Sequence, residues 1–247
     1  MTGIETPELW CVDLRAAGPA LHTLEGRTPR LSPADRARAA DLSDPTVRAE
    51  WVATHIALRL LIERAAGAQC RGATFARSER GKPHLDGAPL AFSISHAPGL
   101  ALIALAPRGG IGVDVERTRR VRVGGTRRAR IEEAGAALSD APLPAEGDPR
   151  FLQAWVRLEA LAKADGCGIG RLLTRLGILC VSDATRAGQA RAGDMVAALL
   201  AGETAPSVRD LQLGESVYAA VASIGLAGVG APVWLPTQVE GLEKLIG

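Results

Sequence analysis

The sequence has little of several features that would assign a protein to a specialised class. Aromatic residues make up 3% of the 247 residues, and the longest apolar run, 100–106, is far short of the roughly 20 residues that a membrane helix needs. The first ten residues lack a basic segment followed by an apolar run, so we expect no secretory signal. The cysteines have no metal-ligand spacing, which predicts reduced thiols in a cytosol. They are Cys11, Cys70, Cys167 and Cys180.

Charge and apolar content narrow the class further. The 29 Lys and Arg residues nearly balance the 27 Asp and Glu residues, and a net charge of +2 argues against a protein that coats nucleic acid. With 47% hydrophobic and 23% charged residues, the chain can bury a substantial core, which excludes disorder. We therefore expect a cytoplasmic globular protein that neither enters a membrane nor binds nucleic acid.

Two segments about a hundred residues apart look alike. Residues 48–67 and 150–166 both have the periodicity of an amphipathic helix, and each is followed by a glycine that ends it. The matching positions, spaced i, i+4 and i+8, are Trp51, His55 and Arg59 in the first segment and Trp155, Glu159 and Lys163 in the second. An accidental likeness between two amphipathic helices is the alternative to a true repeat.

β-type sequence follows each helix. Residues 91–106 contain two strand-like runs joined by a His-Ala-Pro-Gly turn, and residues 216–224 form another strand-like run. The PRGG sequence at 107–110 interrupts the pattern. The sequence therefore predicts two related α+β lobes, 1–108 and 109–247, with the tail from residue 225 onward as irregular surface chain.

The segment 117–130 carries seven arginines and no acidic residue. A solvated loop or helix entry is the simpler interpretation, and a docking surface for an acidic partner is the sharper one.

Two carboxylates stand out in the strand-like run before these arginines. The period of a β-strand places Asp114 and Glu116 on one face, inside an otherwise apolar sequence. Two like charges that are partly buried need a cation. Mg²⁺ with oxygen ligands meets this need, and pairing with the nearby arginines is the alternative of equal weight.

Four further residues could carry chemistry, and each has an ordinary explanation. Glu159 and Lys163 have the spacing of a common stabilising ion pair on a helix, although this helix has few other charges around them. His96 ends a strand in FSISHAPG, where a histidine is usually solvated or capping. Lys82, between Gly81 and Pro83, could lie against a phosphate, but a single tripeptide is a weak signal.

Taken in order, these pieces resemble the larger, two-lobed 4′-phosphopantetheinyl transferases. The resemblance covers about residues 31–223, and each motif alone is weak whereas four in register are strong. The motifs are Gly81-Lys82-Pro83, FSISHA at 92–97, GVDVE at 112–116 and W-x-x-x-E-A-x-x-K from Trp155 to Lys163.

The family implies a fold and a reaction. Its members are pseudo-dimers of two similar α+β lobes, and they transfer the phosphopantetheine arm of coenzyme A to a serine of an apo acyl or peptidyl carrier protein, releasing adenosine 3′,5′-bisphosphate. By this resemblance Asp114, Glu116 and Glu159 hold Mg²⁺ against the pyrophosphate. Glu159 also takes the serine proton, directly or through water, and Lys163 neutralises or protonates the leaving phosphate.

The resemblance also implies a nucleotide site in the first lobe. Lys82, Pro83, Ser95 and His96 would line it, with His96 near the 3′-phosphate. Arg36 and Arg38, after a helix start at LSPADRAR, could reach the same phosphate. An internally duplicated chain can complete such a site alone, so we expect a monomer whose partner is an acidic carrier protein.

Two positions depart from the family pattern. Leu158 stands where the family usually has lysine before the glutamate, and Arg157 could supply the missing charge from another face of the helix. Glu50 stands where the family tends to have a basic residue, for which Arg48 could substitute. Two other functions therefore stay open: a metal-dependent hydrolase of coenzyme A or nucleotide pyrophosphate, and a non-catalytic protein that binds coenzyme A or a carrier.

Overall fold

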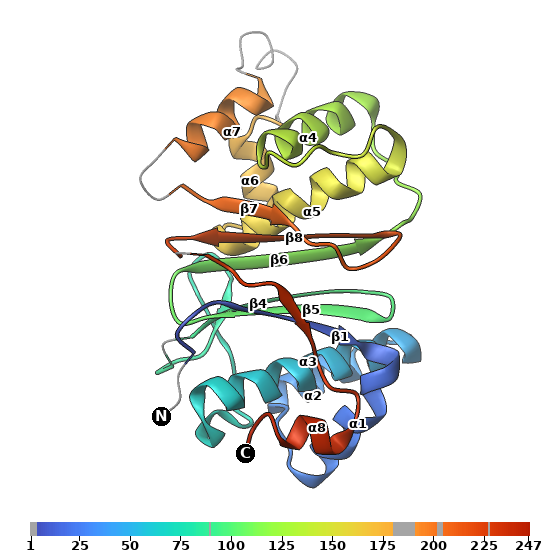
Figure 1. The fold of residues 1–247 in the computed structure, drawn as a ribbon, viewed down its shortest axis with the longest axis vertical. Helices are drawn as coiled ribbons and strands as arrows, with labels where there is room; N and C mark the ends of the chain where they lie inside the picture. The colour runs from blue at the N-terminus through green and yellow to red at the C-terminus, as the bar shows by residue number, and fades with distance from the viewer. Residues whose placement is uncertain (1–3, 89, 180–190, 202–204, 227) are drawn as a thin grey trace. The chain divides into compact units, whose positions relative to one another are not determined.

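The computed structural model describes residues 4–88, 90–179, 191–201, 205–226 and 228–247, so Cys180 lies outside the described residues. The chain divides into two compact units (Figure 1). Unit 1 comprises Met1–Ser78, Pro83–Arg108 and Gly228–Gly247, and unit 2 comprises Glu79–Lys82 and Gly109–Ala227. Each mixes helices with β-sheet, so the fold is of the α+β class.

Unit 1 is built around a four-stranded sheet in the order β4-β5-β1-β9. Its strands are β1 (Glu8–Asp13), β4 (Ala91–Ala97), β5 (Leu100–Ala106) and β9 (Pro232–Trp234), beside a small hairpin of β2 (Ala76–Arg77) and β3 (Pro83–His84). Its helices are α1 (Leu14–Arg27), α2 (Pro33–Ala40), α3 (Pro45–Ala66), η1 (Ala68–Cys70) and α8 (Val239–Glu243).

The expected helix at 48–67 is confirmed as α3, which begins three residues earlier. The Asp44 side chain accepts hydrogen bonds from the backbone N–H groups of Thr46 and Val47, and Pro45 occupies the first turn. The expected hairpin is confirmed as β4 and β5, with Ala97 paired to Leu100 across the turn. Local capping and turn chemistry therefore set both elements.

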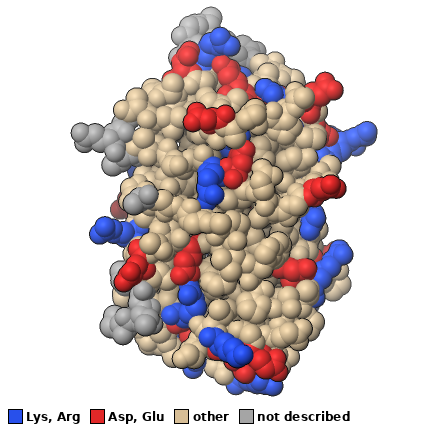
Figure 2. Space-filling view, in the orientation of Figure 1, with Lys and Arg blue, Asp and Glu red and all other residues tan. Residues whose placement is uncertain are grey.

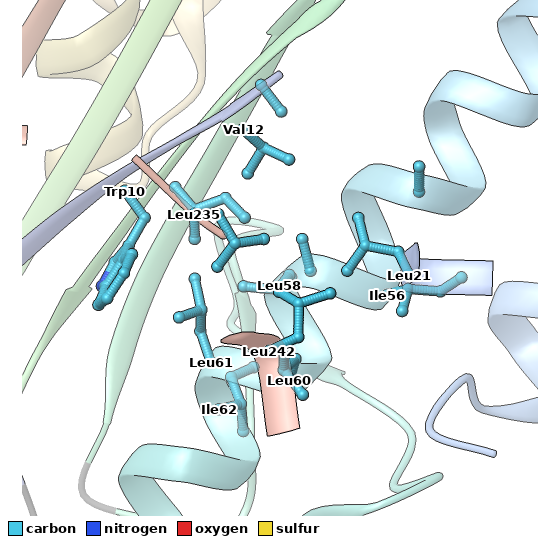
Figure 3. Close-up of a cluster of buried hydrophobic side chains, with 14 of the residues drawn as sticks. Trp10, Val12, Leu21, Ile56, Leu58, Leu60, Leu61, Ile62, Leu235 and Leu242 are labelled. Carbon is cyan, nitrogen blue, oxygen red and sulfur yellow. The ribbon is translucent and has the colours of Figure 1, made fainter. Parts of the chain in front are cut away.

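The core of unit 1 is filled by large apolar side chains from strands and helices. Trp10 and Val12 of β1 belong to the same buried cluster as Leu58 and Leu61 of α3 (Figure 3). Large apolar side chains therefore fill the space between the backbones of β1 and α3.

The tail was expected to be irregular, and this expectation was wrong. Residues of β9 pair in parallel with β1, and Leu235 and Leu242 are buried in the core of unit 1 (Figure 3). Residues 228–247 thus belong to unit 1, which differs from the division at 108/109 suggested by the sequence. Short strands and a five-residue helix leave too little periodicity to be recognised from sequence.

Unit 2 contains a three-stranded sheet in the order β6-β8-β7. Its strands are β6 (Gly110–Arg117), β7 (Ser207–Asp210) and β8 (Val217–Ile224). Its helices are α4 (Gly125–Ala137), α5 (Gly147–Asp165), α6 (Ile169–Arg175) and α7 (Ala192–Leu200). The helix expected at 150–166 is confirmed as α5, which ends at the left-handed Gly166.

The two units share a connectivity. In unit 1, β1 is followed by helices that include the long α3 and then by the β4–β5 pair, whose second strand is antiparallel to β1. In unit 2, β6 is followed by helices that include the long α5 and then by β7 and β8, with β8 antiparallel to β6. The central strand of each trio is therefore the last in the chain.

Within the described ranges, no helix is both long and apolar enough to cross a membrane. The three described cysteines, Cys11, Cys70 and Cys167, are free thiols.

Candidate active site

The strand β6 carries the two carboxylates that the sequence placed on one face. Asp114 is buried and Glu116 is partly buried, and they pair in register with Ala220 and Tyr218 of β8. Gly112 on the same face lies directly against α5. The carboxylates therefore belong to the face of β6 that α5 covers.

Glycines let α5 lie unusually close to this strand. A Cβ atom placed on Gly112 would lie 2.0 Å from the carbonyl oxygen of Ala160 and 2.4 Å from the backbone nitrogen of Ala164. A Cβ on Gly110 would lie 2.7 Å from the carbonyl oxygen of Ala164. Sequence reasoning missed this role of Gly112, although a glycine between buried valine-type positions of a strand is a signal of close backbone approach.

This contact brings Lys163 to Asp114. The Lys163 ammonium lies 2.7 Å from Asp114 Oδ1 and donates a hydrogen bond of 3.0 Å to the carbonyl oxygen of Val113. A lysine side chain on a helix leans toward the helix N-terminus, which carries its ammonium along β6 from Gly112 to Asp114. Lys163 thus pairs with Asp114 on β6, whereas its spacing from Glu159 had indicated an ordinary ion pair within the helix.

Glu159 lies one turn before Lys163, in a setting that disfavours its charge. Burial raises the pKa of Glu159, the negative charges of Asp114 and Glu116 raise it further, and Lys163 partly opposes them. A carboxyl group whose pKa is raised by like charges and burial is typical of functional sites and holds a proton more readily than a surface glutamate.

Glu116 is held by one arginine of the following segment. Arg119 donates from Nε and Nη2 to the two oxygens of Glu116, over 3.1 and 2.9 Å. The alternative in which arginines satisfy these acids thus applies to Glu116, whereas Asp114 is paired with a lysine from α5.

The chemistry of the donors suits Mg²⁺, which prefers carboxylate oxygens, and the charges of Asp114 and Glu116 raise the pKa of Glu159. In the part of the chain that the structure describes, however, no three His, Cys, Asp or Glu side chains are gathered in a cluster that could hold a metal ion. Lys163 and Arg119 bind Asp114 and Glu116 instead. A metal at this site would therefore displace these cations from the carboxylate oxygens.

Lys82 also belongs to unit 2, although it was expected in the nucleotide pocket of the first lobe. Its ammonium donates to the carbonyl oxygen of Ile111 at 2.9 Å and to that of Ala164 at 3.4 Å. Burial lowers the pKa of Lys82 to about 8, with Asp165 opposing this shift.

The other residues of the expected nucleotide pocket lie in unit 1. Ser95 and His96 are on β4 opposite Leu102 and Ala101, with His96 exposed, and Pro83 begins β3. The exposed Arg36 and Arg38 are on α2.

The two departures from the family pattern have definite structural roles. Glu50 accepts a hydrogen bond of 2.8 Å from the backbone N–H of Gly99, so it holds the turn between β4 and β5 beside His96. Leu158 is fully buried in the core of unit 2.

The hypothesis that Arg157 replaces the missing charge is wrong, because Arg157 is fully buried and forms a two-pronged ion pair with Asp210 at 2.7 and 2.6 Å. Arg157 therefore lies in the core of unit 2, on the buried face of α5.

Some arginines of the segment 117–130 bind other parts of unit 2, and the others are exposed to solvent. Arg128 pairs with Glu132 and Asp148, and Arg130 donates to a backbone carbonyl. The exposed members are Arg117, Arg119, Arg120, Arg122 and Arg127. On the face seen in Figure 2, basic and acidic side chains of the described residues are interspersed rather than gathered by sign.

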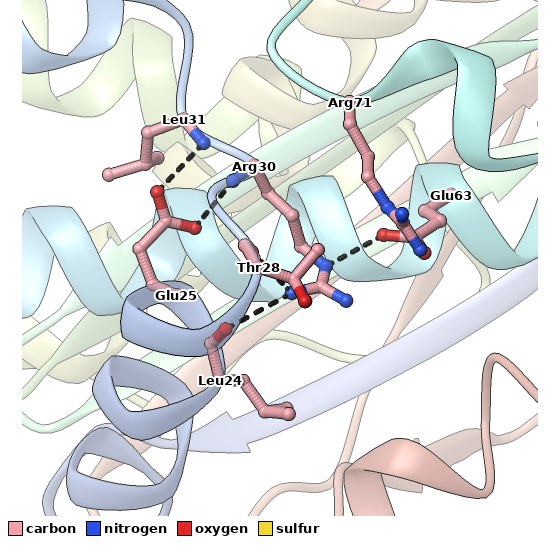
Figure 4. Close-up of polar contacts among 7 residues, drawn as sticks. All are labelled: Leu24, Glu25, Thr28, Arg30, Leu31, Glu63 and Arg71. Carbon is pink, nitrogen blue, oxygen red and sulfur yellow. Dashed lines mark hydrogen bonds and ion pairs between the residues drawn. The ribbon is translucent and has the colours of Figure 1, made fainter.

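The long helix of unit 1 uses its charges differently. Glu63 of α3 is buried and accepts from Arg30 Nε at 2.7 Å and from Arg71, while Arg30 also donates to two backbone carbonyls (Figure 4). Burial alone would raise the pKa of Glu63, but the hydrogen bonds and charges of Arg71 and Arg30 outweigh it and lower the pKa. Glu63 is thus a satisfied structural carboxylate.

Comparison with known proteins adds no relative: no protein-family model matches the chain, and no curated protein sequence matches it.

Proposed function

We propose that this protein is a Mg²⁺-dependent 4′-phosphopantetheinyl transferase that modifies a serine of an acyl or peptidyl carrier protein, with coenzyme A as the donor. The observation that carries the proposal is in unit 2. Glu159, with its raised pKa, lies in the field of Asp114 and Glu116, and Lys163 reaches from the same helix to Asp114. Three acids and a lysine are the residues that the four sequence motifs select for this chemistry.

We also propose that the chain is a pseudo-dimer derived from one duplicated α+β unit. The shared connectivity of the two units supports this. The two units then have different roles: unit 2 provides the acids and Lys163, and unit 1 provides the nucleotide contacts. These contacts come from Pro83, Ser95, His96, Arg36 and Arg38.

In the proposed reaction, the serine Oγ of the carrier attacks the phosphorus next to pantetheine, and the bridging P–O bond to the nucleotide breaks. Glu159 accepts the serine proton, directly or through a water. Lys163 neutralises the oxygen that leaves with adenosine 3′,5′-bisphosphate. A bound Mg²⁺, held by Asp114, Glu116 and Glu159, would neutralise the pyrophosphate oxygens.

The test is intact-mass spectrometry of apo acyl and apo peptidyl carrier proteins incubated with coenzyme A, Mg²⁺ and this protein. We expect a phosphopantetheine-sized mass gain that EDTA abolishes and that Glu159→Gln slows at least about 100-fold. Lys244→Met, at an exposed position of unit 1, is the matched control and should keep full activity. Cleavage of coenzyme A without any gain on a carrier would instead establish a hydrolase, and binding without either reaction a non-catalytic protein.

The exposed arginines after β6 support an acidic carrier as the partner. Charge reversal at Arg120 and Arg122 should raise the KM for the carrier about tenfold at low salt and leave the KM for coenzyme A unchanged. Arg119 is left intact because it also binds Glu116. An unchanged KM for the carrier would remove this segment as the docking surface.

The proposal places the protein in the cytoplasm, in keeping with the free thiols of the three described cysteines.

A further inference from the structure

Lys82 joins the two elements that carry the candidate active site. Its single ammonium donates to the carbonyl oxygen of Ile111 on β6 and to that of Ala164 at the end of α5. Ile111 is two residues from Val113, the carbonyl that Lys163 contacts, and Ala164 directly follows Lys163. The same ammonium thus touches the strand of Asp114 and the helix of Glu159.

The geometry of the strand explains why these carbonyls are accessible to lysine. β6 is an edge strand of its sheet, and the backbone groups of alternate residues in an antiparallel edge strand point away from the neighbour. Thr118 donates to Ser216 of the adjoining segment, which makes the even-numbered residues of β6 the ones facing β8. Ile111 and Val113 therefore turn their carbonyls outward, and Lys82 and Lys163 each bind one of them.

The end of α5 offers a matching site. Carbonyls in the last turn of a helix have no partner within the helix and carry the negative end of its dipole. The stem of Lys82 also covers Gly166, where an added Cβ would lie 3.4 Å from Lys82 Cδ. Beside it, Arg80 pairs with Asp165 over 3.4 Å.

We propose that Lys82 is a positioning residue that fixes the last turn of α5 against β6, so that Lys163 and Glu159 are held at Asp114. This inference rests on the proposed function for its catalytic consequence, but its structural part can be tested without activity. A lysine suits the role because its compact ammonium can donate in three directions, to carbonyls of two different elements, whereas a guanidinium is planar and longer.

The first readout is the side-chain ¹⁵N NMR spectrum of lysine in the protein without ligands. The chain has three lysines, Lys82, Lys163 and Lys244, so each signal can be assigned by substitution. In Lys82→Met the Lys163 signal should shift and broaden, whereas that of Lys244 stays in place. The same shift, smaller, is expected in Arg80→Ala, a milder change at an exposed side chain that serves if Lys82→Met fails to fold.

The second readout is the affinity for Mn²⁺, followed by electron paramagnetic resonance. The Kd should rise about tenfold in Lys82→Met and in Lys82→Arg, because a displaced helix end moves Glu159 relative to the strand. In the transfer assay both variants should lower kcat about tenfold while the KM for coenzyme A changes less than about twofold.

A lysine that served only as a phosphate ligand would behave differently. Lys82→Met would then leave the Lys163 signal and the Mn²⁺ affinity unchanged and raise the KM for coenzyme A, and Lys82→Arg would restore that KM. Those results would overturn the positioning role. Absence of transfer by the wild-type protein would instead refute the proposed function, and the NMR and Mn²⁺ results would still decide the inference.

Discussion

The long helices α3 and α5 occupy corresponding places in the connectivity of their units, yet the surroundings of their glutamates Glu63 and Glu159 differ. In α3, the buried Glu63 is matched by Arg30 and Arg71, which lower its pKa. In α5, Glu159 lies near two further acids, and its pKa is raised. A structural carboxylate is stabilised by its surroundings, whereas one kept for chemistry is held where its charge is disfavoured.

The strands beneath the helices differ in the same sense. β1 contributes Trp10 and Val12 to an apolar core, whereas β6 presents Gly112 and Asp114 to α5. Large side chains keep a helix away from a strand, and glycines let the two backbones touch. Unit 1 therefore uses this interface for a core and unit 2 uses it for a polar site.

The largest expected effect is that of Gly112→Val, which removes the close contact that distinguishes unit 2 from unit 1. Its side chain would overlap the backbone of Ala160 and Ala164, which cannot move without displacing α5. We expect the free energy of unfolding to fall by more than about 4 kcal/mol. Hydrogen exchange read by mass spectrometry should place the loss of protection in β6 and α5.

The matched control is Gly170→Ala in α6, where an added Cβ meets nothing within 4 Å. It should leave stability unchanged or slightly raised, since alanine favours helix. A Gly112→Val protein as stable as this control would show that the close contact of α5 with β6 is not required.

Glutamate-to-glutamine changes in the two helices should have opposite signs. Glu63→Gln leaves the buried Arg30 without its counter-charge and should lower the free energy of unfolding by about 3 kcal/mol. Glu159→Gln removes a charge that burial and Asp114 disfavour, and should raise the free energy by about 1 kcal/mol in metal-free buffer. Urea unfolding at pH 7 measures both, and two changes of the same sign would contradict the contrast drawn between the helices.

A further expected effect concerns pH. Burial lowers the pKa of His55 to about 4, with Trp51 and Asp35 opposing the shift and His96 and Arg59 adding to it. The unfolded chain therefore binds a proton at His55 between pH 6.5 and 4 that the folded chain does not bind. Stability should fall with decreasing pH in this window, by at most about 1.4 kcal/mol per unit.

Urea titrations from pH 7 to 4 test this, with His55→Gln removing the slope that His55 contributes. Glu159 of α5 has a raised pKa, so its contribution has the opposite sign: stability falls as pH rises above the ordinary glutamate value. An identical slope in wild type and His55→Gln would mean that His55 is not the group that titrates.

The sequence predicted much of the fold where periodicity or capping is strong. The two long helices, the β4–β5 hairpin, and the shared face of Asp114 and Glu116 all follow from spacing, and the structure confirms them. The contact of Lys163 with Asp114 could not be predicted, because it depends on the distance at which α5 meets β6 and hence on Gly112.

The errors have physical reasons. Arg157 was expected to supply the missing charge from another face of the helix, but Asp210, from a strand more than fifty positions along the chain, pairs with it and makes its burial possible. The tail was taken as irregular because β9 and α8 are too short to show a period, and they exist only through contacts with β1 and the core of unit 1.

The pairing of β9 with β1 has a consequence for how the protein is made. Unit 1 begins with β1 and is completed by residues 228–247, while almost all of unit 2 lies between them in the chain. During synthesis from the N-terminus, β1 cannot pair with β9 until unit 2 has been translated. The inserted unit can thus fold first on the ribosome, and the host unit closes its sheet last.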